Sequence, residues 1–418
     1  MSPTVFTAAH GWRYGLLGLP LAFVALPLHV LLPNHYAREF GVPLAALGVL
    51  LLASRLFDAF LDPWLGRVVD RLFARSAAAV LRLGALCAAG LALGFALLFS
   101  PPTRDPQALL AWAALALALT YVAFSALTIA HQAWGAMLGG DAAQRSRVVA
   151  WREAFGLAGV LCASALPLLA GFHITAAALG LALAIGWTAW RSGLRPAAVT
   201  HVHPPGWRGP WQQPAFRRLM AVFVLNGIAS AVPATLVLFF VQDRLQAPVA
   251  MQPLFLGSYF LAAALAIPLW LRLVPRLGLE RTWIAGMFTA IAAFAGAAAL
   301  GPGDGYAFLA ICLASGAALG TDLALPAALL AGTIRASGHA GGGEGAYFGW
   351  WNFASKLNLA LAAGLALPLL ALAGYVPGTR DPAALQSLAA AYTLLPCALK
   401  AAAALLLHSL VRRHGSCA

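Results

Sequence analysis

The chain has 418 residues, of which 62% are apolar and 9% are charged, whereas an ordinary soluble domain is about 45–50% apolar and about 25% charged. A soluble globule could not cover its surface with so few polar residues, and a disordered chain would contain fewer apolar ones. The composition therefore predicts a protein embedded in a bilayer. The net charge of +13 does not indicate nucleic-acid binding, because the arginines occur in ones and twos between long apolar stretches, as in cytoplasmic loops of membrane proteins.

Charges and Pro/Gly clusters divide the chain into twelve apolar segments, and a helix needs about 20 such residues to cross about 30 Å of hydrocarbon. The first segment is too long for a cleaved signal peptide and is expected to remain as a span, bent by Pro20, Pro27 and Pro33. The uncharged stretch from Ala154 to Trp190 is too long for one helix, so a turn is expected at Gly171. The predicted spans are 14–36, 43–66, 79–100, 107–131, 151–171, 174–191, 217–241, 251–274, 282–300, 305–332, 345–373 and 383–410.

The arginines predict the orientation of these spans. With the N-terminus inside, most arginines lie on the cytoplasmic side and only Arg38, Arg104, Arg244 and Arg380 lie outside, which also favours an even number of spans with both termini inside. The longest polar interval separates an N-terminal six-helix bundle at 1–191, a cytoplasmic linker at 192–216 and a C-terminal six-helix bundle at 217–418. An all-α polytopic protein with two six-helix halves and a site between them is typical of transporters.

The second span carries Arg55, Asp58 and Asp62, whose spacing of three and four places them on one helix face. Each buried charge costs at least about 2.5–3.5 kcal/mol, and ionisable groups inside a membrane are functional by default. Two nearby carboxylates repel unless a cation or proton is bound with them. Arg55 can balance one, and Lys356 in the eleventh span can balance the other. Fixed ion pairs that hold helices in register are the alternative.

The tenth and twelfth spans each contain one further charge. Asp322 lies between Gly320-Thr321 and Pro326, which predicts a locally irregular helix that faces a cavity. A role of Asp322 in gating or packing is expected, with ion coupling as the alternative. Lys400 is expected to extend its ammonium group toward one end of its span, without a specific role.

Three segments resemble a known family. The run from Arg55 to Gly66, continuing to Asp70-Arg71, resembles the second span of the glycoside–pentoside–hexuronide:cation symporters, the melibiose-permease branch of the major facilitator superfamily. Gly345 to Gly349, leading to Lys356, is similar to the eleventh span of that family. A weaker similarity covers Asp141 to Arg147 and Arg152.

The resemblance implies a major facilitator fold and roles for single residues. Asp58 and Asp62 would bind the coupling cation, Lys356 would balance their charge, and Arg152 would lie near a sugar. A hydroxyl from the fourth span would complete the cation site. The best matches for that hydroxyl are Ser125 and Thr128, and the motif residues assigned to gating are Gly66, Asp70, Arg71 and Arg75.

Departures from the family pattern bear on the ion and the substrate. Leu61 replaces a polar oxygen donor before the second aspartate, and sodium needs several oxygen ligands, so a proton is favoured over sodium. The sugar-binding acids of melibiose-type members are absent from the first span and from the position of Thr128. This makes a galactoside less expected and keeps an apolar substrate open, since related proteins carry lipids.

Aromatic faces with polar neighbours suit sugars and amphipathic molecules, and such groups in the fourth and eleventh spans are Gln132, Trp134, Trp351 and Asn352. The predicted function is cation-coupled symport of a small solute, of the sugar or glycoside class, by alternating access. A lipid or amphipath transporter is the alternative. An enzyme is disfavoured because the close histidine pair, His201 and His203, has no acidic neighbours.

ATP-driven transport within the chain is excluded because neither lysine follows a glycine, as a Walker A loop requires. No cofactor beyond the coupling proton or sodium ion is expected. The expected partners are a small-molecule substrate and membrane lipids, without nucleic acid. The chain is expected to act as a monomer in a bacterial cytoplasmic membrane.

Overall fold

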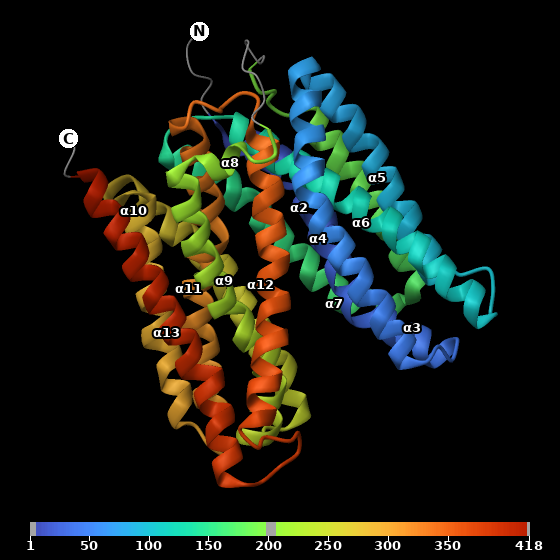
Figure 1. Cartoon of the computed structure of the whole chain (residues 1–418), viewed down its shortest axis with the longest axis vertical. Coiled ribbons are helices and arrows are strands. Elements are labelled where there is room, and N and C mark those ends of the chain that lie inside the picture. Colours follow the sequence, from blue (N-terminus) through green and yellow to red (C-terminus); the bar gives the residue numbers. More distant parts are fainter. Residues whose placement is uncertain (1–5, 198–205, 416–418) are drawn as a thin grey trace. The chain divides into compact units, whose positions relative to one another are not determined.

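The computed structural model describes residues 6–197 and 206–415, and its regular elements within these ranges are helices (Figure 1). His201 and His203 lie outside the described residues. By length and composition, eight described helices could cross a membrane. One of these, Gln252–Ala299, covers two predicted spans. The two spans follow one another within this segment and are separated by a backbone kink at Gly278 (φ 79°).

Contacts between residues divide the chain into two compact units. Met1–Gln212 with Ala331–Phe353 forms the first unit, and Gln213–Leu330 with Ala354–Ala418 forms the second. The predicted halves at 1–191 and 217–418 stay a prediction, but residues 331–353 group with the N-terminal segment. The physical reason is a set of hydrogen bonds and close backbone contacts described below.

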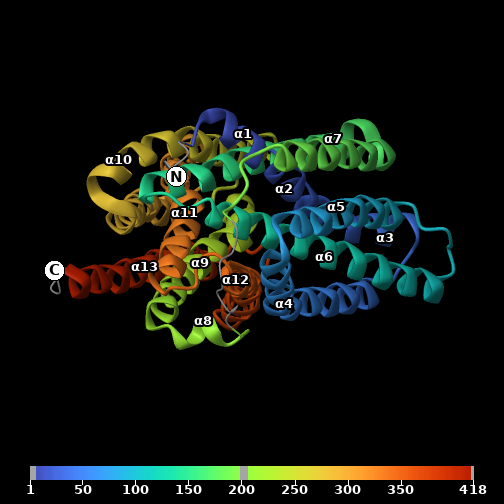
Figure 2. The same ribbon diagram turned by 90° about the horizontal axis from the view of Figure 1, so that it is seen from above.

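The first unit contains α1 to α8 and the start of α12. The first predicted span is bent, as expected from its prolines, and comprises α1 (Ala8–Gly15), α2 (Gly18–Leu26), a π-helical turn at Pro27–Leu31 and α3 (Leu32–Glu39). It is followed by α4 (Leu44–Arg75), α5 (Ala77–Phe99), α6 (Pro106–Met137), α7 (Ala142–Arg191) and the short α8 (Gly209–Gln212). Seen from above, α6 lies beside both α4 and α5 (Figure 2).

The turn predicted at Gly171 is confirmed. Gly171 interrupts α7 with φ 76° and ψ 172°, a left-handed conformation that glycine adopts without the steric cost of a side chain. Two segments of α7, Ala142–Pro167 before this residue and Leu169–Arg191, which contains it near its start, are each long and apolar enough to span a membrane.

Small residues bring α7 against the bent first span. A Cβ atom at Gly159 would overlap the carbonyl oxygen of Leu19, and one at Gly18 would lie 2.5 Å from the carbonyl oxygen of Arg152. Close backbone approach through small residues is the usual way in which helices associate in lipid, where the hydrophobic effect between them is weak. The fully buried His131 adds a tie from α6, since its Nε2 lies 2.9 Å from the carbonyl oxygen of Tyr14.

The second unit contains α9 (Pro214–Phe239), α10 (Gln252–Ala295), most of α11 (Gly305–Ala336), the remainder of α12 (Glu344–Leu372) and α13 (Pro382–Gly415). Here α13 packs against both α9 and α10. Aromatic rings fill the core between these helices: Phe240 and Tyr392 are stacked with centroids 4.2 Å apart, and Phe308 contacts both rings. Offset aromatic pairs of this kind stabilise a core beyond the effect of the area they bury.

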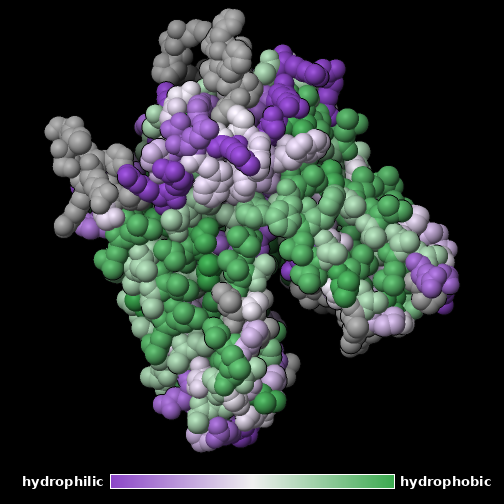
Figure 3. Space-filling view, in the orientation of Figure 1, coloured by the Kyte–Doolittle hydropathy of each residue, from purple (hydrophilic) through white to green (hydrophobic). Residues whose placement is uncertain are grey.

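On the face shown in Figure 3, hydrophobic residues cover the middle of the helices in each unit, and hydrophilic residues gather toward the helix ends. Large hydrophobic side chains are also strongly exposed in both units, as in Leu115 (73%) and Leu265 (67%). A surface that is apolar around the middle of long helices is the pattern expected of a protein solvated by lipid.

Two glycines one turn apart on α7 provide a matched test of this packing. Gly159→Ala is expected to lower stability by about 1–3 kcal/mol, because the added methyl overlaps the Leu19 carbonyl oxygen and the helices must separate. In Gly156→Ala the methyl would lie 3.5 Å from the Ala22 methyl, an ordinary contact, so stability should be unchanged or slightly higher. Apparent unfolding midpoints of both variants in detergent check this. Equal midpoints would contradict the packing described.

Candidate functional site

Asp58 and Asp62 lie on the buried face of α4. Asp58 is 6% exposed and Asp62 is 0% exposed, while Phe57, Phe60 and Trp64 are 48%, 70% and 59% exposed. Residues three and four apart share a helix face, so α4 directs its carboxylates into the first unit and its aromatic rings outward. This places both predicted cation-coupling acids inside the protein.

A hydroxyl group on α6 binds the first of these acids. Ser125 Oγ donates a hydrogen bond of 2.6 Å to Asp58 Oδ1, and both residues are buried. One turn further along α6, the buried hydroxyl oxygen of Thr128 has no hydrogen-bond partner among the described residues. Tyr121, which the sequence analysis missed, interacts electrostatically with Arg55 and with Asp58. Its spacing of four from Ser125 could have identified it, because residues i and i+4 share a face.

Two predicted substrate-binding residues contact one another. Asn352 Nδ2 on α12 donates a hydrogen bond of 2.9 Å to Gln132 Oε1 on α6, and the neighbouring Trp351 is 5% exposed. Trp134, in contrast, is 1% exposed, and its indole N–H donates to the carbonyl oxygen of Leu194 at 3.0 Å. The geometry gives Trp134 a packing role, and a substrate contact for it stays a prediction.

Arg152 is ion-paired with the residue that follows it, Glu153. The Arg152 Nε donates to Glu153 Oε1 at 3.0 Å, and the two side chains are 18% and 20% exposed. Tyr14 and His131 lie within electrostatic reach of the Arg152 guanidinium. The sugar contact implied for Arg152 stays a prediction, and Glu153 is a partner that the sequence analysis did not consider.

The carboxylate of Asp70 holds the first turn of α12. Its Oδ1 and Oδ2 accept hydrogen bonds from the backbone N–H groups of Gly345 (2.6 Å) and Ala346 (2.8 Å), and the residue is 1% exposed. The first N–H groups of a helix have no partner within the helix and attract negative charge. Asp70 therefore caps a helix that begins 274 residues later in the chain.

Glycines allow α4 and α12 to approach closely at this point. A Cβ atom at Gly66 would overlap the carbonyl oxygen of Gly345, and one at Gly349 would lie 2.5 Å from the carbonyl oxygen of Asp62. Gly66, predicted as a gating residue, is thus a point of backbone contact. Because Gly349 packs on the backbone of Asp62, the start of α12 lies directly beside a predicted cation-coupling acid.

A second buried carboxylate, Glu344, organises the glycine-rich turn before α12. It is 2% exposed and accepts hydrogen bonds from the backbone N–H groups of Gly341 (2.7 Å) and Gly342 (2.9 Å). Burial raises the pKa of the Asp70 carboxyl well above its usual range, while the N–H groups of Ala346 and Gly345 act in the opposite direction. Burial likewise raises the pKa of Glu344.

The remaining predicted residues are placed as follows. Arg71 and Arg75 are exposed at the end of α4, where cations also favour the negative end of the helix dipole. Lys356 lies on α12 three residues beyond the part of that helix assigned to the first unit. Its balancing of Asp58 and Asp62 stays a prediction.

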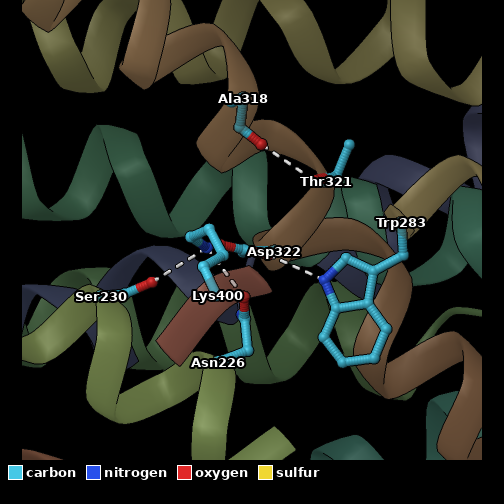
Figure 4. A network of polar contacts seen from close by, with 7 residues as sticks. All are labelled: Asn226, Ser230, Trp283, Ala318, Thr321, Asp322 and Lys400. Carbon is cyan, nitrogen blue, oxygen red and sulfur yellow. Dashed lines mark hydrogen bonds and ion pairs between the residues drawn. The ribbon is translucent and has the colours of Figure 1, made fainter. Parts of the chain in front are cut away.

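The expectations for Asp322 and Lys400 need correction. Lys400 does not extend to a helix end: it is 8% exposed, and its Nζ lies 2.7 Å from Asp322 Oδ2 (Figure 4). The α11 helix is continuous from Gly305 to Ala336 rather than locally irregular at Asp322. The expected cavity is present, since both side chains line a cavity of about 400 Å³ in the second unit. The gating role assigned to Asp322 stays a prediction.

Removing the acceptor at Asp70 tests the capping of α12. Asp70→Ala leaves two buried N–H groups without an acceptor and is expected to lower stability by about 2–3 kcal/mol. Asp105→Ala is the matched control, because Asp105 caps α6 through one hydrogen bond at an exposed position, and its loss should cost about 1 kcal/mol. Hydrogen exchange at Gly345 and Ala346 should accelerate in Asp70→Ala alone. Unchanged exchange there would contradict the capping role.

The pH dependence of stability gives a separate test. Because the pKa of Asp70 is higher in the folded than in the unfolded chain, the free energy of unfolding should decrease as the pH rises from about 4 toward the folded pKa. Asp70→Asn does not titrate and should reduce this slope, leaving the contribution of Glu344. Unfolding midpoints of both proteins across this pH range check the sign. A steeper slope in Asp70→Asn would contradict it.

Comparison with known proteins places these features in a family. The family model described as MFS/sugar transport protein matches residues 13–193 and 205–410. A curated protein of Escherichia coli (strain K12), named glycoside/cation symporter YagG, is 27% identical over 164 residues. The match covers 37% of this chain and 34% of that protein, so it spans about a third of the relative's length.

Solved structures of similar fold extend over nearly the whole chain. The crystal structure of a bacterial homologue of the iron transporter ferroportin in an outward-facing state has a TM-score of 0.67 at 17% identity, covering 95% of this chain and 97% of that one. A crystal structure of the E. coli fucose:proton symporter FucP has a TM-score of 0.66 at 14% identity, covering 96% and 99%. At these identities the similarity shows the fold alone. The chain is a multi-pass membrane protein with the major facilitator fold, and it belongs to the MFS/sugar transport protein family, whose members are transporters rather than enzymes.

Proposed function

We propose that this transporter couples the movement of a cation to that of a small solute of the sugar or glycoside class, by alternating access. The observation that carries the proposal is the buried pair Asp58 and Asp62 on one face of α4, with Ser125 bonded to the first acid. Carboxylates inside a membrane protein mark ion and proton pathways. The glycoside/cation symporter named among the relatives and the fucose:proton symporter of similar fold support the same class.

The proposed coupling ion is a proton. Among the residues proposed for the cation site, Asp58, Asp62, Ser125 and Thr128 carry side-chain oxygen atoms, whereas the side chain of Leu61, next to the second acid, has none. Sodium requires several oxygen ligands in a defined shell, whereas a proton requires one carboxylate oxygen. Lys356 is proposed to balance the pair, with Arg55 beside Asp58.

The proposed substrate contacts are the hydrogen-bonded pair Gln132 and Asn352, together with Trp351, the neighbour of Asn352 on α12, and Arg152 on α7. Amide groups beside an aromatic ring can bind hydroxyls and a sugar face at the same time.

The proposed gating residues are Asp70, Arg71, Arg75 and Gly66, because Asp70 and Gly66 hold the start of α12. The protein is proposed to act as a monomer in the bacterial inner membrane. The distribution of its arginines supports an orientation with both termini in the cytoplasm.

A second candidate function is transport of an amphipathic molecule. The apolar and aromatic wall of the cavity in the second unit favours it, because such walls bind hydrocarbon better than sugar hydroxyls. The two candidates differ in whether transport depends on an ion gradient and in which solutes compete.

Uptake into proteoliposomes tests the proposal. A panel of radiolabelled sugars and glycosides should include one whose uptake rises at least about tenfold under an inward proton gradient, with no effect of sodium. Asp62→Asn should abolish the gradient-driven uptake while leaving the protein folded, because the amide cannot exchange a proton. Glu280→Gln, which neutralises an exposed acid on α10, is the matched control and should transport normally. Gradient-independent transport in Asp62→Asn at the wild-type rate would contradict proton coupling and favour the second candidate.

A further inference from the structure

The second unit contains a cavity of about 400 Å³ between α9, α10, α11 and α13, named here the α9–α13 cavity. Its volume lies within the range of small-molecule sites, about 300–1,000 Å³. Most of its wall is apolar or aromatic, with Phe255, Tyr259, Phe260, Phe294 and Tyr392 as the rings that line it. Such a wall suits an aryl or branched alkyl group.

The polar end of the cavity is an ion pair between helices that are far apart in sequence. Lys400 Nζ on α13 binds Asp322 Oδ2 on α11 at 2.7 Å and Asn226 Oδ1 on α9 at 2.8 Å, and Ser230 Oγ lies 3.4 Å away (Figure 4). On the opposite side of the carboxylate, Trp283 Nε1 on α10 donates to Asp322 Oδ1 at 2.8 Å. Asp322 and Lys400 are the charged side chains among the described residues that line the cavity.

The α9–α13 cavity therefore has an apolar wall and, at one end, the ammonium group of Lys400, whose charge is balanced by Asp322. A net charge inside a membrane bundle is costly, so an anion that binds Lys400 must replace Asp322 as its counter-ion. The displaced Asp322 carboxylate would then be an unbalanced charge, and it becomes neutral only if its Oδ2, the oxygen facing Lys400, takes up a proton. Its Oδ1 can keep the hydrogen bond from Trp283, which holds the carboxyl group in place during the exchange.

We propose that the α9–α13 cavity binds an amphipathic organic monoanion, with its carboxylate at Lys400, its apolar body among the aromatic rings, and one proton taken up by Asp322. Before binding, the site holds one ammonium and one carboxylate. After binding, it holds the same ammonium, the ligand's carboxylate and a neutral carboxylic acid, so the charge stays at zero. The proton comes from bulk water. This site is separate from Asp58 and Asp62, and the inference does not depend on the proposed symport of a sugar.

The other titratable groups around Asp322 do not supply this proton. From α10 and α11 the neighbours are Tyr259 and Cys312, and from α13 they are Tyr392 and Cys397. Phenols and thiols of this kind are neutral below about pH 8. The α9 groups, Asn226 and Ser230, do not titrate in this range, which leaves Asp322 as the group whose protonation follows the ligand.

Binding of 2-naphthoate to the purified full-length protein in detergent tests the inference. Isothermal titration calorimetry in two buffers of different ionisation enthalpy should show uptake of about one proton per naphthoate. Because one proton is taken up per ligand, the affinity should fall about tenfold for each unit by which the pH rises. The uncharged 2-naphthamide should bind much more weakly and without proton uptake. Trp283 fluorescence should change on naphthoate binding, because its indole contacts Asp322. Naphthoate binding without proton uptake at any pH, or equal affinity for the amide, would overturn the inference.

Two variants distinguish the role of Asp322 in naphthoate binding from that of Lys400. Asp322→Asn imitates the protonated acid, so it should bind naphthoate with a nearly flat pH profile. The double variant Asp322→Asn/Lys400→Met removes both charges, which proteins often tolerate better than the loss of one partner, and should bind naphthoate about a hundredfold more weakly while still binding naphthamide. Undiminished naphthoate binding by the double variant would refute the role of Lys400.

Lys356→Met distinguishes this inference from the proposed symport. It removes the cation assigned to Asp58 and Asp62 and should impair gradient-driven uptake, yet naphthoate binding and its proton uptake should remain. Loss of both properties in Lys356→Met would contradict two separate sites. Loss of uptake alone supports both proposals, and failure of naphthoate binding in the wild type overturns only the one made for the α9–α13 cavity.

Discussion

A carboxylate in the interior of a membrane protein needs a hydrogen-bond donor or a cation, because neither lipid nor an apolar core can solvate it. Asp58 and Asp322 meet that requirement with groups from other helices. Asp58 on α4 accepts a hydrogen bond from a hydroxyl group on α6. Asp322 on α11 forms an ion pair with an ammonium group on α13 and accepts a hydrogen bond from an indole N–H on α10. Each of these acids therefore holds helices together, and at both we propose that a proton is exchanged.

The α4 helix contains both the acids proposed to bind the coupling ion and the residues that hold the start of α12. Its acids at positions 58 and 62 are buried among side chains, and two turns later Asp70 caps the start of α12. Gly66 and Gly349 let the two backbones touch between these points. A change in protonation at Asp62 thus occurs beside the backbone contact that positions α12, which gives a short physical route from proposed coupling to proposed gating.

Much of the fold could be predicted from local sequence. Apolar length and breaks predicted long helices such as α5 and α11, and the lack of charge from Ala154 to Trp190 predicted the turn at Gly171, because these features depend on nearby residues alone. The spacing of Asp58 and Asp62 was enough to place both on one face. The partner of Lys400 could not be predicted, because Asp322 and Asn226 lie 78 and 174 residues away and only packing brings them together. The grouping of residues 331–353 with the first unit likewise depends on long-range contacts of Asp70.

Two free cysteines stand in the wall of the α9–α13 cavity, Cys312 on α11 and Cys397 on α13, whereas Cys162 is exposed on α7 in the first unit. A small uncharged alkylating reagent must enter the cavity to reach Cys312, but it meets Cys162 at the surface. Any occupant of the cavity would slow modification of the first thiol and leave the second unaffected. The rate at which Cys312 is alkylated therefore reports whether the cavity is occupied, and the rate at Cys162 serves as the reference. Mass spectrometry of the peptides that contain these two cysteines can follow the occupancy over time.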